Sequence, residues 1–548
     1  MLRGSAAHGA QQDSYIVQSA GAGIPILACR VCGEFLPIKS NAAVDEERSR
    51  LLAELMERPE ASCPDQGCPN HAVPVSRTEA YQSFGLTKSG SRRYRCKSCR
   101  KTFSVGKSTT GHKQPHKNRL IFSLLMNKSP LRRICEVADI GPEGLYGKIE
   151  FLYRQSLAFA AHREDRLLAG MAWPRLYLAT DRQDYVVNWN RHEDRRNVVL
   201  HAVGTADNDT GYVFGMHLNY DPTLDAEEVE HQAVAAGDYQ AKAPFRRFAR
   251  CWLKRDYDAA LKASRASRRL PSGRTVEGDI EATYDEASCR EDVEVSEVQD
   301  VGRRLPTRGM QIHAEYTLYG HFFYLKRLFG GIDKLRFFLD QDSGMRAACL
   351  AAFQPEIVRR DADAFYVRIA KNLTITEKRK AIANSRTIFE VARNANQGLS
   401  AMEVETLLIK ARIAQMAAHG KWQDKWLIHP FPSMSEPEKA VCYLTDYGDY
   451  DPDHLARLYG KASLHGIDSF FMQVRRRLSI LERPIATSSA NWRTWYGYSA
   501  YNPATIVKLL GIFQVFYNYC LAGKDRKTSA MRLGLAKGKV GLEDIIYF

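Results

Sequence analysis

The sequence predicts a multidomain protein in which a cysteine-rich module and an all-α module precede an α/β domain with two insertions. Three observations lead to this prediction. Six of the 12 cysteines fall in close pairs within the first 99 residues. Apolar residues between 117 and 160 recur at helical spacing, and from Leu176 onward they recur at strand spacing. The expected segments are a tail (1–28), the cysteine module (29–112), the all-α module (113–165), the α/β domain (172–520, insertions about 222–310 and 372–455) and a basic, peripheral C-terminal tail (521–548).

Composition points to a polyanionic partner. The net charge is +15 and the isoelectric point is about 9.2, and an excess of Lys and Arg is typical of nucleic-acid-binding proteins. No apolar run reaches the roughly 18 to 20 residues of a membrane span. The first 15 residues lack the apolar core of a signal peptide. We therefore expect a cytoplasmic protein with reduced thiols and no membrane partner.

The paired cysteines indicate a zinc site. Cys63, Cys68, Cys96 and Cys99 supply two thiolates from each of two knuckles, which matches the four tetrahedral ligands of a structural zinc ion. This spacing is typical of a zinc ribbon. Cys29 and Cys32 form a further pair. They either hold a second zinc, with His71 or another ligand, or exchange with the second pair.

The second knuckle lies in a basic segment with DNA-binding character. Residues 89–108 contain seven Lys or Arg interleaved with Tyr94 and Phe103. The cations can meet phosphates while the aromatic rings pack under the knuckle. The DNA-contacting residues expected here are Arg92, Arg93, Arg95, Lys97, Arg100 and Lys101.

Residues 117–160 predict three helices. Ser129 can cap the second helix, and a turn at Ile140 and Gly141 leads to a longer third helix near Pro142. A short second helix, a tight turn and a longer third helix describe a helix-turn-helix. Lys148 and Arg154 lie off the apolar stripe of the third helix and are the expected DNA contacts.

The α/β domain begins with a strand that ends in Asp181. Two further strands follow, 197–205 and 211–218, joined by a turn whose Asn and Asp suit a hairpin. A helix, a strand ending in Asp340, another helix and a fifth strand complete the order of a ribonuclease-H-like fold. The first insertion is expected to have few core positions, and the second is expected to be rich in helices.

Three carboxylates are the candidate catalytic and Mg²⁺-binding residues: Asp181, Asp340 and Asp468. Strands one and four are neighbours in this fold, so Asp181 and Asp340 should face each other. Two-metal phosphodiester cleavage needs acidic ligands that converge on ions about 3.5 to 4 Å apart. Asp342 competes with Asp340, but its place directly before a helix favours an N-cap role. Asp468 lies in the first turn of a helix after the second insertion, whereas Glu482 lies at a helix end.

We expect other roles for the charged residues near these carboxylates in the sequence. Asp184 is expected at the surface or behind the metal ligands. The helix of Asp468 carries Arg475, Arg476 and Arg477, which could hold the DNA backbone.

The chain resembles bacterial insertion-sequence transposases of the DDE class with an N-terminal zinc ribbon. The resemblance covers about 60–165 and 172–520, and rests on CKSCRKTFS, SPLRRICEVADIGPEGLYGKI, LATD, FFLD and IDSFFMQVRRRLSILERP. It implies binding of terminal inverted repeats, Mg²⁺- or Mn²⁺-dependent cleavage, and attack of a 3′-hydroxyl on target DNA. It also implies a dimer or larger assembly that holds two transposon ends, on the bacterial nucleoid. The family usually has Glu as third ligand, so Asp468 would make the triad DDD.

Two other functions fit the same residues. A domesticated, catalytically silent transposase would act as a sequence-specific DNA-binding regulator. A ribonuclease-H-like nuclease without joining activity would use the same metal site.

Overall fold

The computed structural model describes 15–19, 25–29, 35–56, 61–75, 77–87, 91–106, 108–109, 112–188, 197–257, 259, 275–288, 308–370, 373–420, 423–482, 485–486, 494–495 and 502–548. The chain divides into two compact units. The first contains Met1–Leu51, Arg166–Arg475 and Ile480–Val507, and the second contains Leu52–Asp165, Arg476–Ser479 and Lys508–Phe548.

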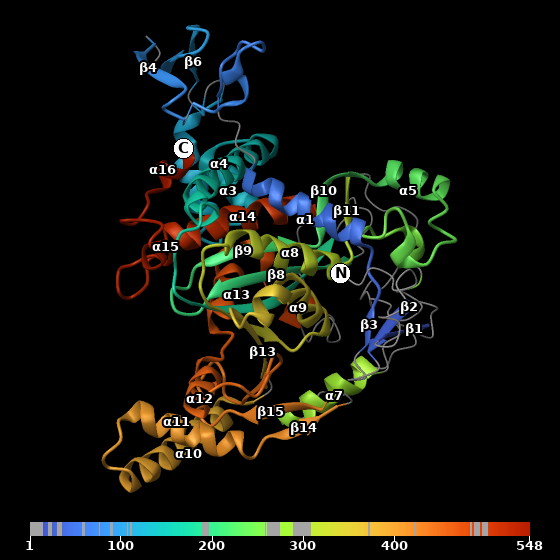
Figure 1. The fold of residues 1–548 in the computed structure, drawn as a ribbon. Coiled ribbons are helices and arrows are strands. Elements are labelled where there is room, and N and C mark those ends of the chain that lie inside the picture. Colours follow the sequence, from blue (N-terminus) through green and yellow to red (C-terminus); the bar gives the residue numbers. More distant parts are fainter. Residues whose placement is uncertain are drawn as a thin grey trace. The chain divides into compact units, whose positions relative to one another are not determined.

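An eight-stranded mixed sheet forms the centre of the first unit (Figure 1). Its order is β14-β15-β16-β13-β12-β7-β8-β9. The five strands predicted from the sequence are present, and β12 runs parallel to both β7 and β13, while β7, β8 and β9 are antiparallel. Their bounds are β7 (Leu176–Asn188), β8 (Asn197–Asp207), β9 (Val213–Leu218), β12 (Leu335–Asp340) and β13 (Ala362–Ile369).

Helices α8 (Ala314–Leu328) and α9 (Ser343–Val358) cover one face of this sheet. Phe337 of β12 packs against Phe322 of α8 and Phe353 of α9. The predicted N-cap is confirmed, because the Asp342 side chain accepts hydrogen bonds from the backbone N–H groups of Gly344 and Met345. Helix α13 (His465–Arg477) contacts the opposite face.

The second predicted insertion contains more strand than expected. Its helices are α10 (Ile375–Ala395), α11 (Ala401–Ile413) and α12 (Pro452–Lys461). Between them, β14 (Ala417–His419), β15 (Asp424–Ile428) and β16 (Lys439–Tyr443) extend the central sheet, with β16 antiparallel to β13. These strands are too short for their alternation to stand out in the sequence.

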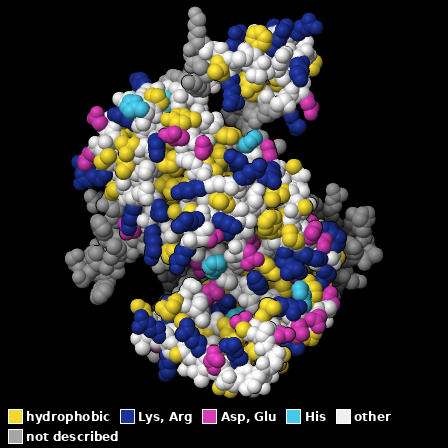
Figure 2. All heavy atoms as spheres, turned by 90° about the vertical axis from the view of Figure 1, so that its left-hand side faces the viewer, with side chains coloured by type: hydrophobic (Ala, Val, Ile, Leu, Met, Phe, Trp, Pro, Cys, Tyr) yellow, Lys and Arg dark blue, Asp and Glu magenta, His cyan; other side chains and the backbone are white. Residues whose placement is uncertain are grey.

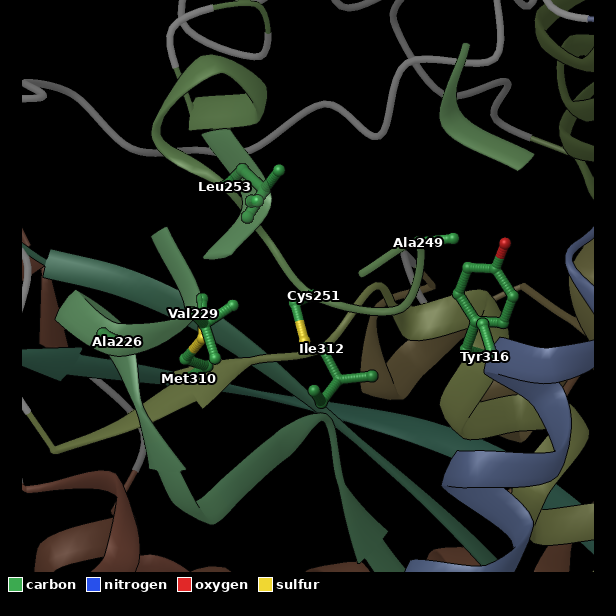
Figure 3. Packing of buried hydrophobic residues seen from close by; sticks show 10 residues of the cluster. Ala226, Val229, Ala249, Cys251, Leu253, Met310, Ile312 and Tyr316 are labelled. Atoms are coloured by element: carbon green, nitrogen blue, oxygen red, sulfur yellow. The ribbon is translucent and has the colours of Figure 1, made fainter. Parts of the chain in front are cut away.

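The first predicted insertion was expected to have few core positions, but its described part contributes to a sizeable buried cluster. Its described part holds β10 (Tyr220–Asp225), α5 (Ala226–Ala235), α7 (Val276–Ser288) and β11 (Arg308–Gln311). Figure 3 shows its buried cluster, in which Val229, Cys251 and Ile312 pack together. Hydrophobic residues that the sequence scatters between polar ones are gathered here by tertiary contacts.

The N-terminal segment also belongs to the first unit up to Leu51. Strands β1 (Tyr15–Ser19), β2 (Pro25–Cys29) and β3 (Phe35–Pro37) form a small antiparallel sheet, and α1 (Asn41–Met56) follows. Glu47 of α1 is fully buried, and it pairs with Arg50 and Arg250. The zinc module was expected to start at 29, whereas the described residues 35–51 belong to the first unit.

The three predicted helices are present in the second unit as α2 (Asn118–Leu125), α3 (Leu131–Ala138) and α4 (Pro142–Leu168). The N-cap of α3 is Pro130 and not Ser129, and it has no side-chain hydrogen bond. The C-terminal tail was wrongly expected to be peripheral. After α14 (Pro503–Tyr519), helices α15 (Ser529–Leu533) and α16 (Leu542–Ile546) follow, and Ile545 and Ile546 are fully buried.

The cysteine-rich part of the second unit is built on a three-stranded antiparallel sheet. Its strands are β4 (Tyr81–Leu86), β5 (Arg92–Cys96) and β6 (Thr102–Val105). The remaining described strands, β17 (Ile485–Ala486) and β18 (Thr494–Trp495), form a two-residue pair. Within the described residues, no helix is both long and apolar enough to cross a membrane.

Candidate functional site

Four predicted ligands, Cys63, Cys68, Cys96 and Cys99, lie together at one end of this small sheet. Their sulfur atoms all lie within 4.8 Å of one another. The Cys63–Cys99 sulfur distance is 3.3 Å and the Cys68–Cys96 distance is 3.7 Å. A tetrahedral zinc ion with 2.3 Å bonds separates its sulfurs by about 3.8 Å. The four thiols therefore fit a metal ion such as zinc.

The surroundings of these thiols favour a bound thiolate. Burial raises the pKa of Cys96, but N–H groups of Cys99, Asn70 and Ser98 outweigh it and lower that pKa to about 6. The Asn70 side-chain nitrogen lies 3.3 Å from the Cys96 sulfur. Burial raises the pKa of Cys63 to about 12. A cation at the centre would replace the remaining protons.

The additional ligands predicted from the sequence do not join this cluster in the described part of the chain. Cys29 is described only as the last backbone position of β2, and Cys32 lies outside the described residues. The Nδ1 atom of His71 lies 2.7 Å from the Cys63 carbonyl oxygen, so this ring supports the knuckle backbone.

The predicted DNA-contacting cations of the module lie on or near its surface. Arg92, Lys97, Arg100 and Lys101 are exposed, and Arg93 and Arg95 are half-buried. Lys101 pairs with Asp65 at 2.9 Å, and Arg93 lies over the ring of Phe84. Tyr94 and Phe103 pack on the buried cysteines, as predicted.

Asp181 and Asp340 lie side by side in the first unit. Strands β7 and β12 are parallel, with Leu339 paired to Thr180. Continuing this register by one residue sets Asp340 beside Asp181, on one face of the sheet. Asp181 is 5% exposed, and Asp340 is half-buried at the end of its strand. The predicted adjacency of strands one and four is therefore correct.

Helix α13 carries Asp468 on the same face of the sheet. Gly204 of β8 is the register partner of Asp181, so a side chain at either position would point to the same face. A methyl group added at Gly204 would lie 2.7 Å from Ile467 Cδ1 and 3.3 Å from Phe471 Cε1. Ile467 directly precedes Asp468, which is half-buried. The helix that carries Asp468 thus packs on the face of the sheet that Asp181 and Asp340 share.

Two polar residues fix the segment before Asp468. Asn208, in the β8–β9 turn, donates to the Ser463 carbonyl at 2.8 Å and accepts from the Gly466 N–H at 2.9 Å. The buried Glu436 carboxylate accepts from the Ser463 hydroxyl at 2.5 Å and from the Leu464 N–H at 3.0 Å. Because both ends of the turn are held, the start of α13 is positioned against the sheet.

The charged residues that follow Asp181 on β7 have partners of their own. The backbone N–H of Arg182 donates to the Asp181 carboxylate at 2.6 Å, and the Arg182 guanidinium lies 3.5 Å from Asp342. Asp184 is exposed, and its carboxylate lies 2.6 Å from His201 Nδ1. Asp184 therefore lies at the surface, as predicted.

The carboxylates do not form a compact metal cluster. Among the described residues, the four cysteines are the one group of three or more His, Cys, Asp or Glu side chains that is placed to hold a metal ion. Asp181, Asp340 and Asp468 are all described, and they do not form such a group.

The structure places only some of the other predicted DNA-contacting Lys and Arg residues at the surface. Lys148 was wrongly placed at the surface: it is 6% exposed, and its ammonium donates to the carbonyls of Lys113 and Gln114. Arg154 is exposed and pairs with Glu150 at 2.7 Å. Arg477 donates to the Met126 carbonyl, so its guanidinium supports the second unit. Arg475 is half-buried and Arg476 is exposed.

Gly204→Ala is expected to destabilise the first unit by about 1 to 3 kcal/mol, the usual cost of overpacking a filled core. The added methyl group would meet Ile467 Cδ1 at 2.7 Å. Chemical denaturation followed by circular dichroism measures the change. Ile467→Val removes that Cδ1 atom, so the double variant should recover part of the loss. Additive effects of the two substitutions would contradict this contact.

Sequence reasoning missed Gly204, Asn208, Glu436 and Gly466. Asn208 lies in a turn that was predicted, but its bonds reach more than 250 positions along the chain. Glu436 lies in an insertion, where a carboxylate is usually exposed. A glycine within a predicted strand was the one local signal, because it often marks a close approach.

No model of a known protein family matches the chain, and no curated protein matches it.

Proposed function

We propose that this protein is a DNA transposase of the DDE class with an Asp-Asp-Asp triad. It would bind transposon terminal inverted repeats, cut DNA in a metal-dependent reaction and join the ends to target DNA. The observation that carries this proposal is that Asp181 and Asp340 lie side by side on the face of the central sheet against which the helix of Asp468 packs. The strand order β9-β8-β7-β12-β13, with β7 and β12 parallel, supports the proposal because a ribonuclease-H-like fold would have this order.

Two metal ions would not require the three carboxylates to form one compact cluster. A single Mg²⁺ ion binds oxygen at about 2.0 to 2.1 Å, so three ligands of one ion must be close. Two ions about 3.5 to 4 Å apart allow ligands of different ions to lie up to about 8 Å from each other. The acidic residues would hold Mg²⁺ or Mn²⁺, which supplies an activated water or 3′-hydroxyl and stabilises the leaving oxygen.

The chain's own groups would position the reaction. Asp181 accepts a backbone hydrogen bond from Arg182, which fixes the orientation of its carboxylate. Glu436 and Asn208 hold the first turn of α13 and thereby the position of Asp468. Arg475 and Arg476, later on α13, could contact the phosphates of the bound strand.

The second unit would bind the transposon end. The Cys63, Cys68, Cys96 and Cys99 cluster suits the zinc ion of a zinc ribbon, and its exposed Arg and Lys side chains suit phosphate contact. The short α3, the turn and the longer α4 suit a helix-turn-helix. Two such chains would be needed to hold two ends in one assembly.

Strand transfer with end-containing duplex DNA and Mg²⁺ tests the proposal. Asp181→Asn, Asp340→Asn and Asp468→Asn should each bind ends normally and lose more than about a hundredfold in cleavage, since the charge that holds the metal is removed. Asp184→Asn, on the same strand and exposed, is the matched control and should cut like the unmodified protein.

Three other outcomes would each favour a different interpretation. Unmodified protein that binds ends but never cuts would favour the silent DNA-binding regulator. Cleavage without joining would favour the nuclease. Full activity of Asp468→Asn alone would move the third ligand to another residue.

A further inference from the structure

The helical hairpin of α10 and α11 has an unusual surface for a folded domain. Helix α10 spans 21 residues and none of them is buried. Packing of one face normally supplies most of the stability of a protein helix. The inner side of α10 is only half-buried, with the Ser385 hydroxyl bonded to the Pro430 carbonyl and Phe389 against Phe431. Most of this helix is therefore free to meet a partner.

Three exposed arginines form a line along α10. Arg379, Arg386 and Arg393 are spaced by seven residues. Seven residues make about two helical turns, so the side chains lie on one side at intervals of about 10.5 Å. Within the described residues, no carboxylate forms an ion pair with any of them. The line lies beside the Ser385 and Phe389 side of the helix, so internal packing does not cover it.

The charge of α10 suits a polyanion. Its five Lys and Arg residues outnumber two Glu residues, giving a net charge of +3. Glu377 is used in the capping box with Thr374, where its carboxylate accepts the Thr374 N–H at 2.7 Å. Figure 2 shows dark blue Lys and Arg side chains on the hairpin, at the bottom of the view.

Ile375, at the start of α10, is exposed on the arginine side, but two other exposed apolar residues of α10 lie elsewhere on its circumference. Ile388 and Val391 are 50% and 64% exposed. At about 100° per residue, they lie on the opposite flank from the arginine line. A self-associating face would have to cover this flank and would leave the arginines in solvent.

We propose that the line of Arg379, Arg386 and Arg393 is a second DNA-contacting surface that binds the phosphates of duplex DNA. This inference rests on the proposed function, since it names a further contact of the same partner. Guanidinium groups suit phosphate because they are planar, always charged and rich in donors. The three positions span about 21 Å, the length of roughly six base-pair steps, so one duplex can engage all three.

The test is the salt dependence of binding to a duplex that carries one transposon end, measured by fluorescence anisotropy between 50 and 200 mM salt. The variant replaces Arg379, Arg386 and Arg393 with Gln. Each lost phosphate contact should reduce the slope of log affinity against log salt by about 0.9, so the total change should approach 2.7. The Lys-for-Arg variant keeps the charges and should keep most of the slope.

A control variant that loses three positive charges elsewhere shows whether the change in slope comes from this surface or from the net charge of the protein. Lys242, Arg247 and Lys254 are exposed on the first insertion, and their triple Gln variant should keep the original slope. An equal loss in both variants would overturn the proposal, as would an unchanged slope in the α10 variant. An unchanged slope combined with altered sedimentation would show that α10 mediates self-association instead.

Cleavage by the unmodified protein and the salt slope of the α10 variant together show whether this inference or the proposed function fails. If the unmodified protein cuts ends and the α10 variant keeps its slope, the second surface is wrong and the transposase proposal stands. If the unmodified protein never cuts and the slope still falls, the DNA contact stands and the catalytic proposal fails.

Discussion

Replacing Cys96 with Ser is expected to abolish metal binding and unfold the cysteine-rich module between 61 and 106. The module's buried cluster contains three cysteines and Tyr81, so little apolar core remains without the metal. Structural zinc contributes about 10 to 16 kcal/mol in small zinc-binding peptides, more than such a core can replace. Metal content by mass spectrometry and cleavage by trypsin within 61–106 measure the two effects.

Cys135→Ser is the matched control for this prediction. Cys135 is half-buried on α3, outside the cluster, and its substitution should leave metal content unchanged. Binding of the end duplex should fall in the Cys96 variant only, because its basic strands lose their scaffold. A Cys96 variant with full metal content and normal protease resistance would remove the cluster from any structural role.

Glu436→Ala is expected to cost about 3 to 5 kcal/mol, since it leaves a buried ammonium without its counter-ion. Lys439 is 5% exposed, and its Nζ atom lies 3.0 Å from Glu436 and 2.7 Å from the Ala462 carbonyl oxygen. The variant also frees the Ser463 hydroxyl and the Leu464 N–H, which precede α13. Urea unfolding followed by circular dichroism measures the loss.

The double variant Glu436→Leu with Lys439→Met provides the control. An apolar pair of similar volume often restores the stability that a broken buried ion pair loses. Stability should therefore recover while the hydrogen bonds that hold the start of α13 stay absent. If Glu436→Ala stays within about 0.5 kcal/mol of the unmodified protein, the pair is not structurally important.

Local patterns predicted the parts of the fold that local physics determines. The near-continuous apolar runs in 176–181 and 335–340 mark strands because both faces of a central strand are covered. The Asp342 N-cap was predictable, since its acceptor meets donors only two and three residues away. The cysteine cluster followed from spacing, because each knuckle is a short turn.

Features that depend on distant segments could not be predicted in this way. Lys148 lies off an apolar stripe, but the chain before α2 folds back and supplies two carbonyls to its ammonium. The last residues of the chain are basic, yet Ile545 and Ile546 are enough to anchor them in the second unit. Asp468 could be placed on a helix, whereas the position of that helix depends on Glu436 and Asn208.

The parallel pairing of β7 and β12 has a consequence for synthesis of the chain. The β12 side of β7 stays unpaired until residues 335–340 have been made, almost 160 residues after Asp181. At roughly 5 to 20 residues per second, this delay lasts about 8 to 32 s. During that time, a hydrophobic strand edge is open to pairing with other chains. Slow growth at low temperature or a strand-shielding chaperone should therefore decide how much of the protein is recovered in folded form.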